Sequence, residues 1–356
     1  MMLTLPFCFA LLAAEAPLGP PSIVKPPALR LGDTIAIVGP ASPTPPEDVA
    51  EAVRNIRKLG YEVRVAASTS ARFGYLAGDD EARTRELMEA FLDPAVRVIL
   101  CARGGYGSPR ILDRLDYAAI RKNPKILVGY SDLTALLLAV HSRAGVVTFH
   151  GPMAGKDFSG RAGLSPFASR HFFSLLDGGT SFAEAAPAWG FGQQAPAEPL
   201  LTLAPGEAEG PLLGGNLSTI AALLGTPFEP DFRGVILFLE DVNEEPFRID
   251  RMLCQLRLSG KLAHARGIVL GAFTRCVARS PRESLTTEEV LRSSLVPLRI
   301  PVLAGYPSGH LSEQVTLPIG VRVRLNATAG TLSLVESAVE TMPTIPKTLP
   351  GPVEPK

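Results

Sequence analysis

Apolar and polar residues follow two different periods in the first half of the chain. Buried strands are predicted where apolar residues gather in short runs, at 35–38, 61–65, 96–101, 125–128 and 146–149. Between these strands, 47–59, 79–92 and 164–176 carry apolar residues at helical spacing. Gly60 and Pro94 each follow a helix and end it. Strands that alternate with helices predict an open α/β domain with a mainly parallel sheet.

The second half also mixes strands and helices. Strands are predicted at 234–239, 267–273, 301–306, 321–325 and 331–335, and helices at 218–224, 246–259 and 288–295. Residues 178–210 are rich in Ala, Pro and Gly with little periodicity, which predicts a connection between two domains. The expected organisation is therefore a leader or weak signal peptide at 1–27, an N-terminal domain at 28–177, a C-terminal domain at 211–337 and a disordered tail at 338–356.

The composition excludes several classes of function. The 356 residues include 35 Lys+Arg and 35 Asp+Glu, so the net charge is zero. A neutral chain offers no overall electrostatic attraction for nucleic acid or for an anionic membrane surface. The four cysteines are scattered without CxxC spacing, which predicts neither a zinc site nor a disulfide framework.

The N-terminus leaves the location of the protein open. Residues 3–14 are apolar, and Ala14-Glu15-Ala16 resembles the cleavage site of a signal peptide. The stretch lacks the basic residues that usually precede such a signal, and it is too short to span a membrane as a helix. We favour a cytoplasmic location and keep export to the periplasm as the alternative.

Ser131 stands at a predicted turn from a buried strand into an apolar helix. A serine in this place has its hydroxyl at the open end of a sheet, near the N–H groups that begin a helix. Such a position suits a nucleophile. The alternative is that Ser131 caps the helix and Asp132 interacts with its dipole.

A glycine-rich loop at 103–107 follows the strand predicted at 96–101. It lacks both GxGxxG spacing and a Walker lysine, so we do not interpret it as a nucleotide loop. If strands 96–101 and 125–128 are neighbours, this loop and the serine turn share one end of the sheet. The backbone N–H groups of Gly105 and Asp132 would then be able to hold an oxyanion.

Ser131, Glu240 and His310 are each expected in a loop directly after a buried strand. A histidine can take the proton of a serine hydroxyl, and a carboxylate can fix the tautomer of that histidine. The order Ser, Glu, His therefore permits a catalytic triad. His150, which also follows a strand, is interpreted as structural.

Four motifs together resemble a known family. They are RGGYG at 103–107, GYSD at 129–132, Glu240-Asp241 with RIDR at 248–251, and Gly309-His310. In this order they are similar to the L,D-carboxypeptidase family of serine peptidases, which includes muramoyltetrapeptide carboxypeptidases and related microcin-immunity peptidases. The resemblance extends from about residue 31 to about residue 335.

The resemblance implies a fold and an activity. The fold would be a flavodoxin-like, mainly parallel sheet domain followed by a smaller β-rich mixed α/β domain. Ser131 would be the nucleophile, His310 the base, Glu240 its orienting carboxylate, and Gly105 and Asp132 the oxyanion donors. The substrate would be a small peptide or muropeptide, namely a peptidoglycan stem tetrapeptide that loses its terminal D-Ala. The family requires no metal or organic cofactor, and its members are often homodimers.

Arg103 is our candidate for binding the free carboxylate of the substrate, because it lies beside the proposed oxyanion donors. A structural salt bridge is the alternative role. Three other functions remain open: an esterase of the α/β-hydrolase type, although the turn lacks the second glycine of GxSxG, a non-catalytic two-domain binding protein, and an immunity peptidase acting on a peptide-nucleotide antibiotic.

Overall fold

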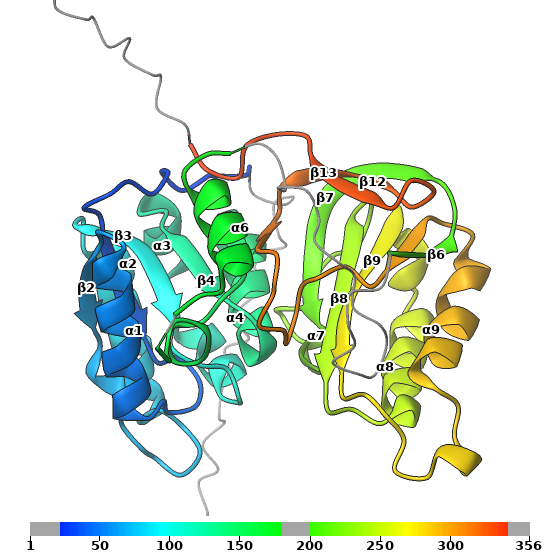
Figure 1. Ribbon diagram of the computed structural model, residues 1–356, viewed down its shortest axis with the longest axis horizontal. Coiled ribbons are helices and arrows are strands. Elements are labelled where there is room, and N and C mark those ends of the chain that lie inside the picture. Colours follow the sequence, from blue (N-terminus) through cyan, green and yellow to red (C-terminus); the bar gives the residue numbers. More distant parts are fainter. Residues whose placement is uncertain (1–21, 162, 180–199, 341–356) are drawn as a thin grey trace, which may run out of the picture.

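The computed structural model describes residues 22–161, 163–179 and 200–340, which form two α/β domains side by side (Figure 1). The first domain contains most of the chain up to α6 (Pro166–Leu176), and the second begins at β6 (Leu201–Ala204). The predictions for residues 1–21, 180–199 and 341–356 lie outside the described residues.

The first sheet has the strand order β11-β5-β4-β3-β1-β2. Its strands are β1 (Thr34–Val38), β2 (Glu62–Val65), β3 (Val96–Cys101), β4 (Ile126–Gly129), β5 (Thr148–His150) and β11 (Leu317–Ile319). The first five pair in parallel, and only β11 is antiparallel to its neighbour β5. Their carboxyl ends therefore meet at one edge of the sheet, where ligands of such sheets bind.

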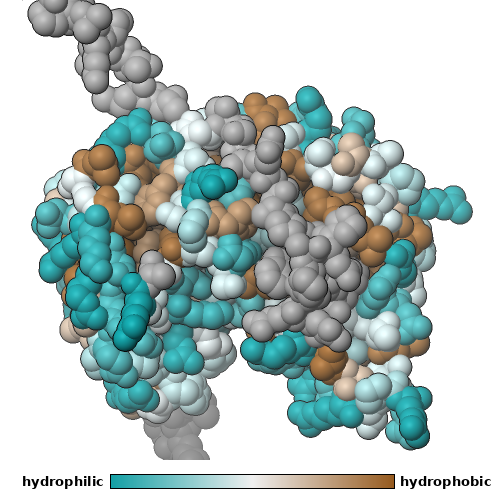
Figure 2. Space-filling model, viewed as in Figure 1, coloured by the Kyte–Doolittle hydropathy of each residue, from teal (hydrophilic) through white to brown (hydrophobic). Residues whose placement is uncertain are grey.

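Helices cover this sheet with their apolar faces, apart from α4 (Thr134–Ala139), which is buried on all sides. They are α1 (Pro46–Lys58), α2 (Asp80–Leu92), α3 (Tyr117–Lys122), α4, α5 (Ala154–Asp157) and α6. In α1, Val49, Ala52 and Ile56 are buried at helical spacing. The left of Figure 2, where α1 and α2 lie in Figure 1, is largely hydrophilic.

The second sheet has the strand order β13-β12-β7-β8-β9-β10-β6 and is mixed. Its strands are β6, β7 (Glu207–Asn216), β8 (Ile236–Val242), β9 (Gly267–Thr274), β10 (Val302–Ala304), β12 (Arg322–Asn326) and β13 (Thr331–Leu334). Strands β7 to β10 run parallel, whereas β6, β12 and β13 pair antiparallel at the edges. Its main helices are α7 (Leu217–Leu223), α8 (Pro246–Leu258) and α9 (Thr287–Leu295). The predicted fold class is confirmed.

Several predicted boundaries were wrong. β6 and the start of β7 lie inside the predicted connection 178–210, and β11 leaves the second half of the chain to join the first sheet. The helix predicted to follow Ser131 begins as a 3-10 turn and ends as a π-turn at 140–144, before left-handed Gly145. None of the helices in the described ranges is long and apolar enough to cross a membrane.

Candidate active site

The turn at Ser131 has an unusual backbone. β4 ends at Gly129, Tyr130 is extended, and Ser131 adopts the left-handed conformation with φ 65°. Non-glycine residues rarely adopt this conformation, which costs on the order of 1 kcal/mol and is common at functional sites. No side-chain cap begins the helical turn or α4, so the interpretation of Ser131 as a helix cap was wrong. Ser131 is half-buried at the carboxyl edge of the sheet.

The glycine loop lies directly against this turn. β3 and β4 are parallel neighbours, which confirms that both loops share one end of the sheet. The Ser108 hydroxyl donates to the Asp132 carbonyl at 2.6 Å, and the Ser108 N–H donates to the Asp132 carboxylate at 2.8 Å. A Cβ built on Gly104 would lie 3.0 Å from that of Ser131. No backbone hydrogen bond of the described residues uses the N–H of Gly105, which leaves it free for a ligand.

Glu240 and His310 form a buried pair. His310 Nδ1 lies 2.7 Å from a Glu240 carboxylate oxygen, with Glu240 fully buried and the His310 side chain 11% exposed. Burial alone would raise the pKa of Glu240, but His310 at hydrogen-bond distance lowers it below its ordinary value. Glu240 therefore stays ionised and accepts a hydrogen bond from Nδ1–H, which leaves Nε2 of His310 free to act as a base.

The surroundings of this pair differ from the prediction. Glu240 lies inside β8 instead of in a loop, because β9 continues to pair beyond it through Asp241 and Val242 after an irregularity in register. His310 lies well beyond the end of β10. Gly309 has φ +120°, and a Cβ there would lie 2.8 Å from the Glu240 carboxylate, so only glycine lets this loop approach so closely.

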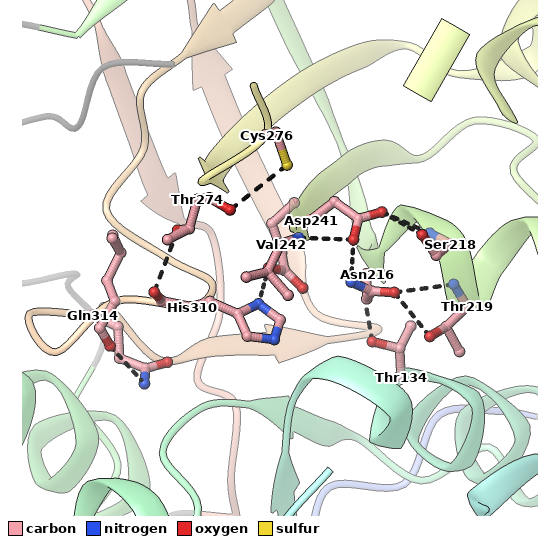
Figure 3. A network of polar contacts seen from close by, with 12 residues as sticks. Thr134, Asn216, Ser218, Thr219, Asp241, Val242, Thr274, Cys276, His310 and Gln314 are labelled. Carbon is pink, nitrogen blue, oxygen red and sulfur yellow. Dashed lines mark hydrogen bonds and ion pairs between the residues drawn. The ribbon is translucent and has the colours of Figure 1, made fainter. Parts of the chain in front are cut away.

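The structure brings the serine turn and this pair together from different domains. The Tyr130 ring, adjacent to Ser131 in the chain, contacts the His310 ring edge-on at a centroid distance of 5.0 Å. On the other side of the turn, the Asn216 N–H donates to Thr134 Oγ1 at 3.0 Å (Figure 3). Asn216 pairs with Glu240 between β7 and β8. The turn that carries Ser131 therefore lies beside the His310–Glu240 pair, where the two domains meet.

Comparison with known proteins identifies the family of this chain. The model of the LD-carboxypeptidase N-terminal domain matches residues 35–151, and that of the LD-carboxypeptidase C-terminal domain matches 209–325. A probable murein peptide carboxypeptidase from Bacillus subtilis (strain 168) is 42% identical over 315 residues, covering 88% of this chain and 95% of that protein. The chain belongs to the LD-carboxypeptidase family.

Solved structures share the fold of this LD-carboxypeptidase. The crystal structure of muramoyltetrapeptide carboxypeptidase from Oxalobacter formigenes is 36% identical with a TM-score of 0.73, covering 85% of this chain and 97% of that one. MccF in complex with glutamyl sulfamoyl guanosine is 25% identical with a TM-score of 0.79, covering 89% of this chain and 99% of that one. The protein is thus a serine-type carboxypeptidase, and neither an α/β-hydrolase esterase nor a non-catalytic binding protein.

Sequence reasoning singled out Asp241 as part of a motif but missed the hydrogen bonds that it makes in this LD-carboxypeptidase. Asp241 is buried and accepts hydrogen bonds from Asn216 Nδ2 at 3.0 Å and from the N–H and hydroxyl of Ser218 at 2.9 and 2.7 Å. Burial, with the neighbouring Glu240 charge, raises the pKa of Asp241 to about 6. The position of Asn216, after two glycines and before a predicted helix, is typical of an N-cap. Its Oδ1 accepts from the Thr219 N–H at 3.0 Å at the start of α7.

Two cations flank the serine turn of the carboxypeptidase. Arg103 is exposed, and within the described ranges it has neither an ion pair nor a hydrogen bond, so the structural salt bridge finds no support. Lys156, in α5, lies 5.3 Å from the centroid of the Tyr130 ring. Among the described residues, no cluster of three or more His, Cys, Asp or Glu is arranged to hold a metal ion.

His150 of this LD-carboxypeptidase is fully buried behind the site. Its ring lies 5.0 Å from that of Phe238 and 5.8 Å from that of Tyr130, and neither ring nitrogen has a hydrogen-bond partner. Burial, only partly offset by Glu240, lowers the pKa of His150 to about 4. The imidazole is therefore neutral at physiological pH.

Replacing His150 with glutamine is expected to make stability less sensitive to acid. The unfolded chain protonates this histidine below its ordinary pKa of 6.5, whereas the folded protein resists protonation until about 4. Its contribution to the free energy of unfolding is therefore fully present above pH 6.5 and is lost as the pH falls, by about 2 kcal/mol at about pH 5. Urea unfolding near neutral pH and at about pH 5 measures how much the free energy of unfolding falls with pH. This fall should be smaller in the variant than in the wild type by about 2 kcal/mol. Replacing the exposed His264 with glutamine is the control, and equal losses in both variants would contradict the expectation.

Proposed function

We propose that this enzyme removes the terminal D-Ala from peptidoglycan stem tetrapeptides through a Ser131–His310–Glu240 triad. The observation that carries the proposal is the 2.7 Å contact between His310 and buried Glu240, beside the left-handed turn that presents Ser131. The substrate class follows the names of its relatives, a probable murein peptide carboxypeptidase and a muramoyltetrapeptide carboxypeptidase.

The reaction proceeds by acyl transfer. Ser131 attacks the carbonyl of the diamino acid while His310 Nε2 takes its proton, and Glu240 stabilises the imidazolium that forms. The N–H groups of Gly105 and Asp132 hold the oxyanion, each donor contributing about 3 kcal/mol to the transition state. His310 returns the proton to the departing amine of D-Ala. Water, activated by His310, then hydrolyses the acyl-enzyme and restores Ser131.

Product analysis tests this function. Purified protein is incubated separately with two free stem tetrapeptides that differ only in the configuration of the terminal alanine. The masses of the products are then measured by mass spectrometry. The proposal requires loss of one alanine from the D-Ala peptide, with the L-Ala peptide much slower. A folded enzyme that leaves the D-Ala peptide intact would contradict it.

Replacing Arg103 with alanine is expected to weaken binding of peptides that end in a free carboxylate. A guanidinium without a protein partner can form a charge-assisted hydrogen bond to that carboxylate, an interaction absent from an amidated peptide. KM for the free-carboxylate substrate should rise about tenfold, with little change for its C-terminal amide. Arg110→Ala removes a nearby arginine that is instead paired with Asp80, and serves as the control. Equal effects of Arg103→Ala on both peptides would remove the assignment.

An immunity-type substrate is the second candidate. It is favoured by the likeness to MccF, whose structure contains glutamyl sulfamoyl guanosine. The two functions separate when kcat/KM is compared for the tetrapeptide and for an aminoacyl sulfamoyl nucleoside. A higher value for the nucleoside would reverse the order of the two proposals.

The proposal includes a homodimer, which the resemblance to the family implies, and a cytoplasmic location, which we favour over export to the periplasm. Free tetrapeptides from recycling occur in the cytoplasm, whereas an exported enzyme would meet the intact wall. Sedimentation of the full chain tests the dimer, and fractionation of cells tests the location. A monomer at micromolar concentration would contradict the dimer, and recovery of the protein outside the cytoplasm would contradict the location.

A further inference from the structure

The two halves of the catalytic site belong to different domains, so their separation must be fixed by contacts between the domains. Ser131 follows a strand of the first sheet, whereas Glu240 lies in the second sheet and His310 in a loop beyond it. Transfer of a proton from serine to histidine depends steeply on their separation, and a misplacement of about 1 Å can cost about 100-fold in rate. A contact that sets this separation therefore acts on catalysis without touching the substrate.

Thr134 connects the serine turn to the second domain. Its backbone N–H donates to the carbonyls of Ser131 and Asp132, so it moves with the nucleophile. Its side-chain oxygen accepts the Asn216 N–H at 3.0 Å, and Thr134 is fully buried. One residue thus hydrogen-bonds to Ser131 through its backbone and to the other domain through its hydroxyl.

The partner of Thr134 is itself rigidly held. Asn216 Nδ2 donates to Asp241, and Asn216 Oδ1 accepts from the N–H and hydroxyl of Thr219 at 3.0 and 2.9 Å (Figure 3). In the parallel pairing of β7 with β8, Asn216 lies opposite Glu240. The N–H that Thr134 accepts therefore belongs to the residue paired in the sheet with Glu240, which contacts His310.

A glycine with an unusual backbone conformation makes room for the contact between Thr134 and Asn216. Gly215 has φ +142°, and a Cβ there would lie 2.6 Å from Thr134 Oγ1 and 2.7 Å from its methyl group. Glycine is required both for the conformation and for the close approach of β7 to α4. The end of β7 therefore packs against the side chain of Thr134 without any intervening group.

We propose that Thr134 is a positioning residue that sets the distance between Ser131 and the His310–Glu240 pair through its hydrogen bond to Asn216. This inference rests on the proposed function, because it assigns Thr134 a role in that reaction. The essential group of Thr134 is its hydroxyl oxygen, because this oxygen accepts the backbone N–H of Asn216. A substitution at residue 134 can remove the acceptor, whereas the donor belongs to the backbone and is present in every variant. Serine keeps the acceptor, whereas valine keeps the shape and removes it.

The test compares Thr134→Val with Thr134→Ser and with Thr148→Val. Thr148 is a matched control, because it is equally buried and donates its hydroxyl to the Leu137 carbonyl of the same helix, within one domain. With the tetrapeptide as substrate, Thr134→Val should lower kcat 10- to 100-fold with KM unchanged. Thr134→Ser and Thr148→Val should stay within threefold of the wild type. Thr134→Ala provides the same loss of acceptor if the valine variant does not fold.

A second readout separates this inference from the proposed substrate. The rate at which a small organophosphorus reagent modifies Ser131 depends on activation of the serine and not on recognition of a peptide. This rate should fall in Thr134→Val by the same factor as kcat. A wild type that reacts with the reagent but leaves the tetrapeptide intact would remove the substrate and keep the inference. The inference would be overturned if wild type and Thr134→Val were modified at equal rates, or if kcat fell equally in Thr134→Val and Thr148→Val. It would also be overturned if Ser131 of the wild type did not react with the reagent.

Discussion

Replacing Ser131 with alanine is expected to lower kcat by about 10⁴-fold or more. Without the hydroxyl there is no nucleophile for acyl transfer, and the remaining oxyanion donors and binding contacts supply only a small part of the rate. Alanine adopts the left-handed φ of 65° at about the same cost as serine, so the fold should be retained. Substrate binding should also be retained, because the missing oxygen is needed mainly in the transition state. Steady-state rates of D-Ala release measure the effect.

A matched serine substitution shows whether the loss is specific. Ser142 lies further along the same helical segment, and its hydroxyl donates to the Ala139 carbonyl at 3.3 Å. Ser142→Ala should therefore keep the wild-type rate, and circular dichroism should show that both variants are folded. Comparable activity of Ser131→Ala and Ser142→Ala would remove Ser131 from the mechanism.

Replacing Glu240 with glutamine is expected to lower kcat by about 10³- to 10⁴-fold. The ionised carboxylate accepts from Nδ1–H of His310 and stabilises the imidazolium, whereas an amide can donate to Nδ1 and favour the tautomer that carries its proton on Nε2. That tautomer cannot take the proton of Ser131. Because the size of the side chain is unchanged, KM should change little. Steady-state rates measured over a range of pH give the size of the loss.

The control for this variant is an exposed glutamate. Glu288 lies on α9 and pairs with Arg292 at 2.7 Å on the surface, so Glu288→Gln should leave the rate unchanged. If Glu240→Gln retained activity like Glu288→Gln, the 2.7 Å contact with His310 would have no part in catalysis.

Local pattern was sufficient to predict most elements of the fold. The strand expected at 96–101 is β3 to the residue, because a continuous apolar run has few alternatives to a buried parallel strand. The helix expected at 79–92 begins one residue later, since Asp79 is its cap and accepts from the Ala82 N–H at 2.7 Å. The pairing of β11 with β5 was not predictable, because it depends on how the two domains meet and not on any local pattern.

The candidate site was only partly accessible from the sequence. Motif order and family resemblance singled out Ser131, Glu240 and His310, but the burial of Glu240 inside a strand is tolerable only because His310 reaches it from a distant loop. The roles of Asn216 and Thr134 depend on the register between β7 and β8 and on the contact between domains. Neither is visible in residue spacing.

Trapping the acyl-enzyme tests the central claim most directly. A stem peptide that ends in D-lactate in place of D-Ala has an ester at the scissile position, which speeds acylation relative to hydrolysis of the intermediate. Rapid acid quench and mass spectrometry of the whole protein should show one added stem tripeptide acyl group, located on the fragment that contains Ser131 and absent from Ser131→Ala. An adduct on any other residue, or continued hydrolysis with no adduct at any quench time, would contradict the nucleophile that this account assigns.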